Sequence, residues 1–507
     1  EMRISENQQA HISHVRIYGN DRLYEEVVRR ELRTKPGDLF SKDALMRSAR
    51  EIQSMGFFDP EKVNPDIQPN YEDGTVDINW PLEQKSNDQV EFSLGWGQTG
   101  VIGRISLKLN NFSMRNLFGK NKMHRGIMPI GDGEQLALSA QTNGSYYQSY
   151  SISYSSPWFG GRRPNAFNVG AYYSKQTDIN SSYYNSSWMN SMYNYYGGYG
   201  SYNNYLNNYE SYLDDDKYVQ LFGLSVGWGK RLRWPDDYFQ LSVSLSYQRY
   251  MLRDWQYFII SNGNCNNINL GITLARTSTD NQMFPRRGSE FMASVTLTPP
   301  WSKFDNKDYS KLATDRTSAT YEQEQQEKYR WIEYHKWKFK ARTFTALTSG
   351  QKCFVLMSRV EFGILGSYNK DKKSPFENFY VGGDGMSGYS TGYAQETIGL
   401  RGYENGSLTP WSAPGYAYDR FTLELRYPFM LGNTTIYGLT FLEGGNAWYD
   451  TKKFNPFDMK RSAGVGVRIF LPMVGMMGID WAYGFDKALS TGTKGGSQFH
   501  FILGQEF

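Results

Sequence analysis

Apolar and polar residues alternate along most of this chain, from about residue 90 to its end. In the segment 239–248, Phe, Leu, Val, Leu and Tyr occupy the odd positions, and Gln and Ser occupy the even ones. The same period of two runs through 104–110, 290–297 and 464–471. Successive side chains of a β-strand point to opposite faces of its sheet, so a period of two indicates strands. The chain is therefore expected to consist mainly of strands with one apolar and one polar face.

Composition narrows the class of β-protein. No run approaches the roughly 18 consecutive apolar residues that a membrane-spanning helix needs. Hydrophobic residues make up only 39% of the chain, yet aromatics reach 16%, with 39 Tyr and 50 Gly. So many aromatics argue against disorder, two cysteines cannot form a disulfide framework, and a formal charge of +4 gives no sign of nucleic-acid binding. This profile is typical of a transmembrane β-barrel, whose strands place only alternate residues in lipid.

A soluble sandwich of two sheets would also alternate, since one face of each sheet is wet. Three features favour a membrane barrel: polar residues at inward positions, aromatics at strand ends, and turns that are alternately short and long. We therefore predict a transmembrane all-β fold, a 16-stranded antiparallel outer-membrane β-barrel behind a small N-terminal α+β domain. The expected strands are 90–97, 101–110, 133–143, 146–155, 165–176, 218–231, 239–251, 267–277, 289–300, 330–346, 353–366, 417–428, 435–448, 461–471, 476–485 and 498–507.

Three long extracellular loops are expected between these strands. Residues 177–217 are rich in Tyr, Asn, Ser and Gly, which suits either a flexible surface loop or a docking surface for partners. Residues 301–329 include a short helical pattern around 322–328, and residues 367–416 form the longest loop. Cys265 is expected near an outer loop and Cys353 at the opposite end of the barrel, too far apart for a disulfide.

The first 86 residues follow a different pattern, with the order β-α-α-β-β over 12–86. Asp21 is expected to cap a helix through Leu32, and Ser41 a second helix that stops at Gly56. Strands are expected at 57–70, interrupted by prolines, and at 75–83. Residues 1–11 would be a linker or the remnant of a preceding domain, and 87–507 the barrel. Because the chain starts at Glu1 and no apolar leader follows, we expect a mature protein or a fragment.

Several motifs carry a resemblance to a known family. The segments 39–41 and 52–58, Leu-Phe-Ser and Ile-Gln-Ser-Met-Gly-Phe-Phe, resemble a POTRA domain, although they would also serve as helix packing and a glycine cap. Further motifs in matching order resemble the BamA family of outer-membrane barrels: 285–288, 377–383, 399–403, 441–448, 461–466 and the terminal Phe507. Members of that family usually carry several POTRA domains, and one is visible here. The resemblance implies an outer-membrane location, with the POTRA domain in the periplasm.

The resemblance also assigns roles to the longest loop. In the family this loop folds back into the barrel lumen, and its Arg pairs with acidic residues on nearby strands. Glu424 alternates with apolar neighbours and so faces inward, whereas the strand of Glu443 has apolar residues of the same parity and an ambiguous orientation. The alternative is a surface Arg in a glycine-rich loop. The expected loop motif is Leu400, Arg401, Gly402 and Tyr403, with acidic partners Glu424 and Glu443.

The first and last strands are expected to form a lateral gate. The terminal Phe with alternating hydrophobics resembles the β-signal of outer-membrane proteins, and glycine weakens strand pairing. A weak seam can open and expose an edge to which an incoming strand adds. The expected gate residues are Val90, Phe92, Leu94, Gly95, Phe499, Phe501, Leu503, Gly504 and Phe507.

The implied function is that of the central subunit of the outer-membrane β-barrel assembly machinery, without cofactor, metal or catalytic residue. Its expected partners are BAM lipoprotein subunits on the periplasmic side, unfolded outer-membrane protein clients, lipid and lipopolysaccharide, surface partners at 177–217, and no nucleic acid. The five histidines join no recognisable enzyme motif, and His500 is interpreted as lumenal filler. The alternatives are a TamA-like or two-partner secretion pore, or a passive porin or transporter.

Overall fold

The computed structural model divides the chain into two compact units, Glu1–Tyr172 and Tyr173–Phe507, and the dividing line falls within one strand, β8. The predicted boundaries 12–86 and 87–507 stay predictions. The structure describes residues 9–59, 62–85, 88–97, 100–118, 129–144, 146–161, 164–179, 213–236, 238–255, 260–281, 283–305, 307–313, 318–384, 396–410, 414–432, 434–471 and 475–503.

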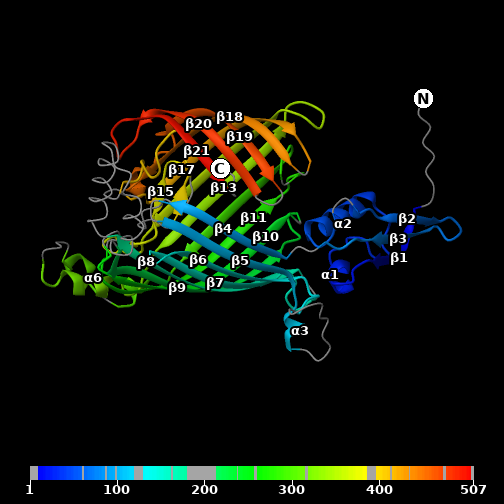
Figure 1. Cartoon of the computed structure of the whole chain (residues 1–507), viewed down its shortest axis with the longest axis horizontal. Coiled ribbons are helices and arrows are strands. Elements are labelled where there is room, and N and C mark those ends of the chain that lie inside the picture. Colours follow the sequence, from blue (N-terminus) through cyan, green and yellow to red (C-terminus); the bar gives the residue numbers. More distant parts are fainter. Residues whose placement is uncertain are drawn as a thin grey trace, which may run out of the picture. The chain divides into compact units, whose positions relative to one another are not determined.

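The N-terminal domain has the predicted order β-α-α-β-β (Figure 1). Its sheet has the order β1-β3-β2, with β1 parallel and β2 antiparallel to β3. Apolar residues of the helices and strands, among them Val28, Ile52 and Trp80, form its buried core. The elements are β1 (His11–Tyr18), α1 (Glu25–Arg29), α2 (Lys42–Ser54), β2 (Asp66–Asn70) and β3 (Thr75–Pro81).

Two details of this domain differ from the prediction. Ser41 caps α2 as expected, its Oγ accepting from the Ala44 amide at 3.3 Å. The first helix, however, begins at Glu25 after Tyr24 and ends at Arg29, so Asp21 is not its cap and it stops before the expected Leu32. The backbone amides of Arg22 and Tyr24 bond to the Gln84 side chain and the Gly131 carbonyl, which holds this segment out of the helix. The strand expected over 57–70 is confined to Asp66–Asn70.

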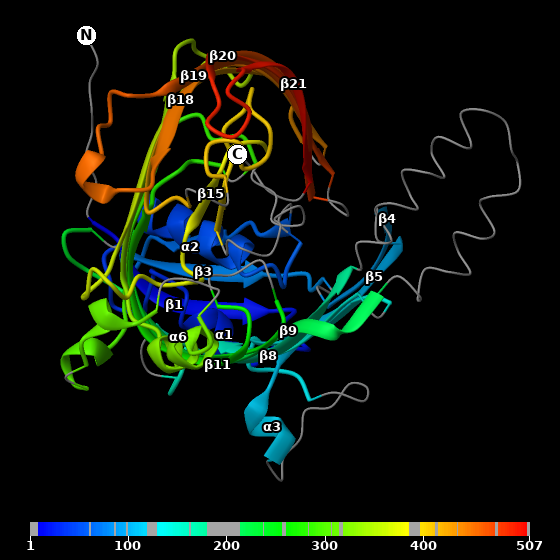
Figure 2. The same ribbon diagram turned by 90° about the vertical axis from the view of Figure 1, so that its left-hand side faces the viewer.

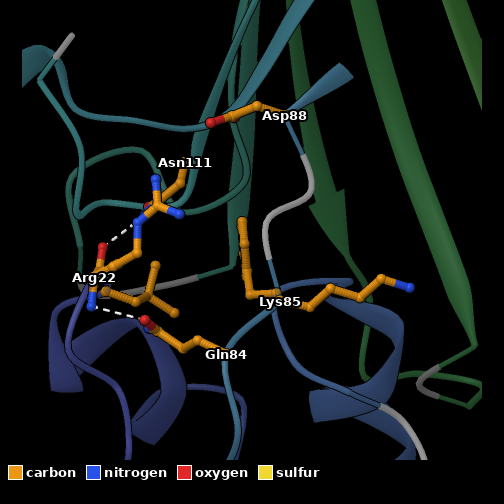
Figure 3. Close-up of a pocket in the computed structure, with 7 residues that line it drawn as sticks. Arg22, Gln84, Lys85, Asp88 and Asn111 are labelled. Atoms are coloured by element: carbon orange, nitrogen blue, oxygen red, sulfur yellow. Dashed lines mark hydrogen bonds between the residues drawn. The ribbon is translucent and has the colours of Figure 1, made fainter. Parts of the chain in front are cut away.

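Asn111, at the end of β5, ties the N-terminal domain to the first strands of the long sheet. Its Nδ2 donates to the Arg22 carbonyl at 2.6 Å, and its Oδ1 accepts from the amides of Gly131 and Gly133, both at 3.2 Å. The Gln84 side chain accepts a hydrogen bond from the Arg22 amide at 2.8 Å. Arg22, Gln84 and Asn111 help to line a cavity of about 20 Å³ (Figure 3). One buried amide therefore satisfies three backbone groups from two loops.

The long sheet has sixteen strands in the order β21-β20-β19-β18-β17-β14-β13-β12-β11-β10-β9-β8-β7-β6-β5-β4. Every pair whose register is described is antiparallel, which confirms the predicted fold class. The first unit contains β4 (Gln89–Gly97), β5 (Gly100–Phe112), α3 (Met114–Phe118), β6 (Glu134–Asn143) and β7 (Tyr147–Ser156). It also contains the part of β8 (Asn165–Ile179) that precedes Tyr173.

The second unit contains the remaining strands. They are β9 (Leu213–Arg231), β10 (Phe239–Arg253), β11 (Gly263–Thr277), β12 (Gly288–Leu297), β13 (His335–Ala346), β14 (Val355–Gly366), β17 (Ala417–Met430), β18 (Thr435–Trp448), β19 (Lys460–Leu471), β20 (Gly475–Lys487) and β21 (Lys494–Leu503).

Several strand ends differ from the prediction for identifiable reasons. β12 stops at Leu297 because Pro299 and Pro300 have no N–H to continue the ladder. β13 starts at His335, since residues 330–334 bond instead to Asn266 and Thr298. β8 and β9 extend into the loop expected over 177–217, where both faces are polar and no alternation marks the strand. β21 starts at Lys494, four residues early, and its expected end at 504–507 lies outside the described residues.

In β17–β21 one face of the sheet is apolar and exposed, and the opposite, buried face carries both ionic and apolar residues. No helix in the described part of the chain is long and apolar enough to cross a membrane, a finding without bearing on proteins that cross with strands. The exposed face of β17–β21 carries Leu423, Leu425, Leu442, Val465, Val467, Ile479, Trp481, Phe499 and Phe501.

The long loops of the second unit have secondary structure of their own. The described part of the loop over 367–416, residues 367–384, 396–410 and 414–416, lies against the concave face of the sheet beneath β18–β21 (Figure 2). Rings from several strands and loops pack around it, among them Tyr250 stacked on Phe376. Cys265 is buried in the same cluster and Cys353 in another, and both are free. The loop elements are η3 (Trp301–Lys303), η4 (Tyr309–Lys311), α6 (Tyr321–Tyr329), β15 (Phe379–Val381), β16 (Glu396–Ile398) and η6 (Thr451–Lys453).

Candidate functional site

Arg401, at the tip of the loop over 367–416, is fully buried and contacts carboxylates from three strands. Its Nη2 lies 2.8 Å from Glu424 Oε1 on β17, and its Nε lies 3.3 Å from Glu443 Oε2 on β18. Its Nη1 lies 3.0 Å from Asp480 Oδ2 on β20. The structure thus brings Arg401 together with both acidic residues singled out from the sequence and with a third that the sequence did not reveal.

Three more arginines from the strands share these carboxylates. Arg420 donates from Nε to Glu443 at 2.9 Å, Arg426 from Nε to Glu424 at 2.8 Å, and Arg468 from Nη2 to Asp480 at 2.8 Å. Buried charges are costly unless each is paired and hydrogen-bonded, and here each carboxylate serves two guanidinium groups. We call these seven residues the loop-tip network: Arg401, Arg420, Arg426, Arg468, Glu424, Glu443 and Asp480.

The orientation of Glu443, which the sequence left ambiguous, is toward the concave face. Tyr437, Leu439 and Phe441 share its parity and are buried on that face with it. The Arg401 guanidinium lies over the Phe441 ring, 3.5 Å from its centre. An inward apolar residue therefore has a function here, because it forms the platform on which the loop arginine stacks.

The loop motif itself is held by its backbone as well as by Arg401. The Arg401 amide donates to Glu443 Oε2 at 2.8 Å, and Leu400 exchanges backbone hydrogen bonds with Gly383. Gly402 has φ +85°, a conformation that favours glycine, and a Cβ there would lie 2.9 Å from the Gly484 amide nitrogen. Tyr403 donates its hydroxyl to the Arg461 carbonyl at 2.8 Å. All four motif residues are therefore buried in the sheet's concave side.

Electrostatics keep the loop tip charged and hydrogen-bonded across the physiological pH range. Burial alone lowers the pKa of Arg401, but the carboxylates of Glu443, Glu424 and Asp480 outweigh it, so that the pKa is raised. Burial raises the pKa of Tyr403 to about 12, which keeps its hydroxyl a donor. The tip is thus permanently cationic and matched to an anionic cradle.

A second ionic contact fastens the base of the loop. The buried ammonium of Lys336, on β13, forms an ion pair with Glu377 and lies 3.5 Å from Glu396 Oε2. Lys338, on the same face of β13, lies 2.8 Å from Glu396 Oε1. Glu377 lies just before β15, and Glu396 is the first residue of β16. These two short strands pair in parallel and lead into the loop tip. Base and tip are therefore anchored to different strands.

The gate residues predicted from the sequence lie on the two terminal strands of the sheet order. On β4, Phe92, Leu94 and Gly95 pair with Ile105, Gly103 and Ile102 of β5. On β21, Phe499, Phe501 and Leu503 pair with Trp481, Ile479 and Met477 of β20. Val90, Phe499 and Phe501 are exposed, whereas Gly504 and Phe507 lie outside the described residues.

His500 is not the filler that the sequence suggested. Its Nε2 accepts a hydrogen bond from the Gly402 amide at 2.9 Å, and it pairs across the ladder with Asp480. Sequence parity marks Asp480, Arg468 and His500 as inward, but nothing in the sequence indicates which loop atoms they meet. In the described part of the chain, no group of three or more His, Cys, Asp or Glu could hold a metal ion.

Comparison with known proteins identifies the fold. Residues 130–507 match the model of the Omp85 superfamily domain. The chain belongs to the Omp85 superfamily. Residues 10–83 also match the POTRA model described as surface antigen variable number repeat. These two matches place the protein in the outer membrane with its POTRA domain in the periplasm.

The sequence relatives are assembly factors. BamA of Neisseria meningitidis is 23% identical over 449 residues, covering 84% of this chain and 43% of the relative. A putative outer membrane protein assembly factor of Treponema pallidum is 30% identical over 157 residues, covering 31% of this chain and 17% of the relative. The chain therefore spans less than half the length of these relatives, and it is BamA-like.

Solved structures agree on the fold. BamA from Haemophilus ducreyi lacking POTRA domains 1–3 has a TM-score of 0.54 at 17% identity, covering 98% of this chain and 84% of that one. CdiB from Escherichia coli has a TM-score of 0.55 at 12% identity, covering 97% and 76%. At these identities the likeness shows the fold alone.

Proposed function

We propose that this chain is the membrane-embedded subunit of a machinery that folds and inserts outer-membrane proteins. The observation that carries the proposal is the loop-tip network, in which a loop arginine is held by Glu424, Glu443 and Asp480 on the concave face of an Omp85 sheet that follows a POTRA domain. The relatives named as assembly factors support the same role.

The proposed mechanism is strand addition at a gate between β4 and β21. An unpaired strand edge offers backbone donors and acceptors to an incoming strand, and a membrane allows no such group to stay unpaired. The client gains backbone pairing and buries its apolar face in lipid. No catalytic group, nucleotide or metal is needed, because backbone pairing and burial of the apolar face supply the free energy of insertion.

The partners follow from the same proposal. Unfolded outer-membrane proteins are the clients, and lipoprotein subunits bind on the periplasmic side near the POTRA domain. Lipid and lipopolysaccharide contact the exposed apolar face of the strands. A surface partner at 177–217 remains a further proposal, since residues 180–212 lie outside the described part of the chain.

A secretion pore of the same superfamily is the second candidate. The fold likeness to CdiB, with a TM-score equal within 0.01 to that for BamA, is the observation that favours it. The two functions differ in the final location of the client protein. An assembly factor leaves its client folded in the membrane, whereas a secretion pore releases it on the far side.

A cysteine lock tests the gate. Pairs of cysteines, one on β4 and one on β21, are introduced after Cys265 and Cys353 are replaced by alanine. The protein is reconstituted into lipid vesicles, and insertion of an unfolded outer-membrane protein is followed by its protection from protease. Pairs that cross-link should block insertion, and reduction should restore it. Full insertion by a cross-linked variant would refute the gate, and release of the client into the vesicle interior would favour the secretion pore.

A further inference from the structure

The loop tip contacts the last strand as well as β17, β18 and β20. Gly402 and His500 are 98 residues apart in sequence, yet the Gly402 amide donates to His500 Nε2 at 2.9 Å. His500 lies on β21 and is buried, with 5% of its surface exposed. This contact joins the loop to the strand that forms one side of the proposed gate.

Glycines on three elements make this approach possible. A Cβ on Gly484 of β20 or on Gly495 of β21 would lie only 2.2 Å from the Gly402 carbonyl oxygen. A Cβ on Gly495 would also come within 2.8 Å of the Tyr403 ring. The tip backbone therefore rests directly on the backbone of the last two strands, and His500 supplies the side-chain acceptor at the end of this surface.

The contact requires one protonation state of the imidazole. An N–H donor needs a free lone pair on Nε2, and a doubly protonated imidazole has only donors. The four charged residues that surround His500 come from two strands and the loop: Asp480 opposite it on β20, Glu443 on β18, and Arg401 and Asp384 on the loop. Burial of the ring, the largest influence, opposes protonation, as does Arg401, whereas the three carboxylates attract a proton to the ring. Acidification would thus convert the acceptor into a donor that faces another donor.

We propose that His500 is a positioning residue that fastens the loop tip to β21, and that protonation of its imidazole releases the tip from this strand. The inference rests on the proposed function only in taking β21 as one side of the gate. Loss of the contact would leave the tip bound to β17, β18 and β20 through Arg401, while β21 loses its side-chain hydrogen bond to the loop and keeps only the backbone packing at Gly495. His500 therefore sets how firmly the last strand is held.

Two substitutions separate the acceptor from the titrating ring. His500→Gln keeps an oxygen that can accept from the Gly402 amide at every pH, and His500→Leu removes the acceptor. The readout is hydrogen exchange of the Gly402 amide in lipid nanodiscs, corrected for the intrinsic rate, between about pH 8 and about pH 4. This range extends well below the ordinary imidazole pKa of about 6.5, because burial opposes protonation. This measurement needs no client and no accessory subunit.

The wild-type amide should be protected at high pH and lose protection on the order of tenfold on acidification, the equivalent of one ordinary hydrogen bond. His500→Gln should stay protected throughout, and His500→Leu should be unprotected throughout. A pH-independent wild type, or a His500→Gln variant with the wild-type pH profile, would overturn the proposal.

Client insertion at about pH 8 gives the second arm. His500→Gln should insert clients at the wild-type rate, and His500→Leu should differ from it. Equal rates for all three proteins would show that the contact positions nothing of consequence. Absence of insertion by the wild type would count against the proposed function alone, because the exchange result does not depend on it.

Discussion

Arg401 and Asp480 are 79 residues apart in sequence, yet the guanidinium Nη1 of one lies 3.0 Å from the carboxylate Oδ2 of the other. Arg468 binds the same carboxylate through Nη1 and Nη2, so Asp480 links a loop cation to a strand cation. Removal of either partner would leave a buried charge with incomplete pairing. The loop-tip network should therefore contribute to barrel stability as well as to loop position.

Arg401→Ala should destabilise the folded barrel by about 3–5 kcal/mol, the usual effect of breaking a buried ion pair from one side. Three carboxylates would lose a shared cation, and the Arg420, Arg426 and Arg468 pairs would compensate only in part. The measurement is the midpoint of heat modifiability on gels. Arg461→Ala is the matched control, because Arg461 lies next to the site but pairs with Asp486 at an exposed position. Equal midpoints for Arg401→Ala and the control would contradict the prediction.

Glu443→Asp tests the length of the acidic side chain that binds the Arg401 amide and guanidinium. Glu443 accepts from the Arg401 amide at 2.8 Å, from Arg420 Nε at 2.9 Å and from Thr422 Oγ1 at 2.8 Å. A side chain shorter by one methylene cannot reach donors on both the loop and β17, so about 1–3 kcal/mol should be lost. The free energy of unfolding in denaturant measures this loss. Glu404→Asp, at an exposed loop position, is the control, and a Glu443→Asp variant more stable than wild type would exclude the argument.

Parity along the strands predicted part of this site. Glu424 stands between two outward leucines, and its inward orientation follows from them. Glu443 could not be oriented in the same way, because Tyr437, Leu439 and Phe441 share its parity. The structure supplies the reason: Phe441 lies beneath Arg401, and Tyr437 and Leu439 pack in an apolar cluster with Phe284 and with inward residues of other strands, so inward residues there need not be polar. Parity separates the faces of a sheet, but it does not show which face is dry.

The contacts of Asp480 and His500 with the loop could not be predicted from the sequence, for a different reason. Asp480 and His500 stand at inward positions, but their contacts depend on the path of a loop that begins more than one hundred residues earlier. That path is set by packing and by glycines at close approaches, and neither has a local sequence signal. The first helix shows the same limit. Its expected cap, Asp21, is displaced because the amides of Arg22 and Tyr24 bond to groups outside the helix.

Asn111→Ala should loosen the join between the POTRA domain and the first strands. The substitution removes the side-chain acceptor of the Gly133 amide and the donor to the Arg22 carbonyl, whereas the Gly131 amide keeps the Asn111 backbone carbonyl as an acceptor. A buried backbone group left unpaired costs about 1–3 kcal/mol, so this segment should open more often. Limited proteolysis between the POTRA domain and β4 should become faster. Asn70→Ala, at the exposed end of β2 in the same domain, is the control, and unchanged cleavage in Asn111→Ala would contradict the prediction.

The base of the long loop offers a test of coupling between two buried charges. Lys336→Met keeps the length of the side chain but leaves Glu377 without its ion pair, so the loop base should detach more readily. Cleavage of the loop over 367–416 by added protease, in vesicles that expose the outer face, should increase. Lys307→Met is the control, because Lys307 pairs with Glu327 at an exposed position.

A double variant completes this test. Lys336→Met combined with Glu377→Gln removes both charges, so the buried site no longer holds an unpaired ion. The double variant should therefore be cleaved more slowly than the sum of the two single effects predicts, because residues in direct contact are not additive. Strict additivity of the two substitutions would show that the Lys336–Glu377 pair does not hold the loop, and the anchoring would then fall to Lys338 and Glu396.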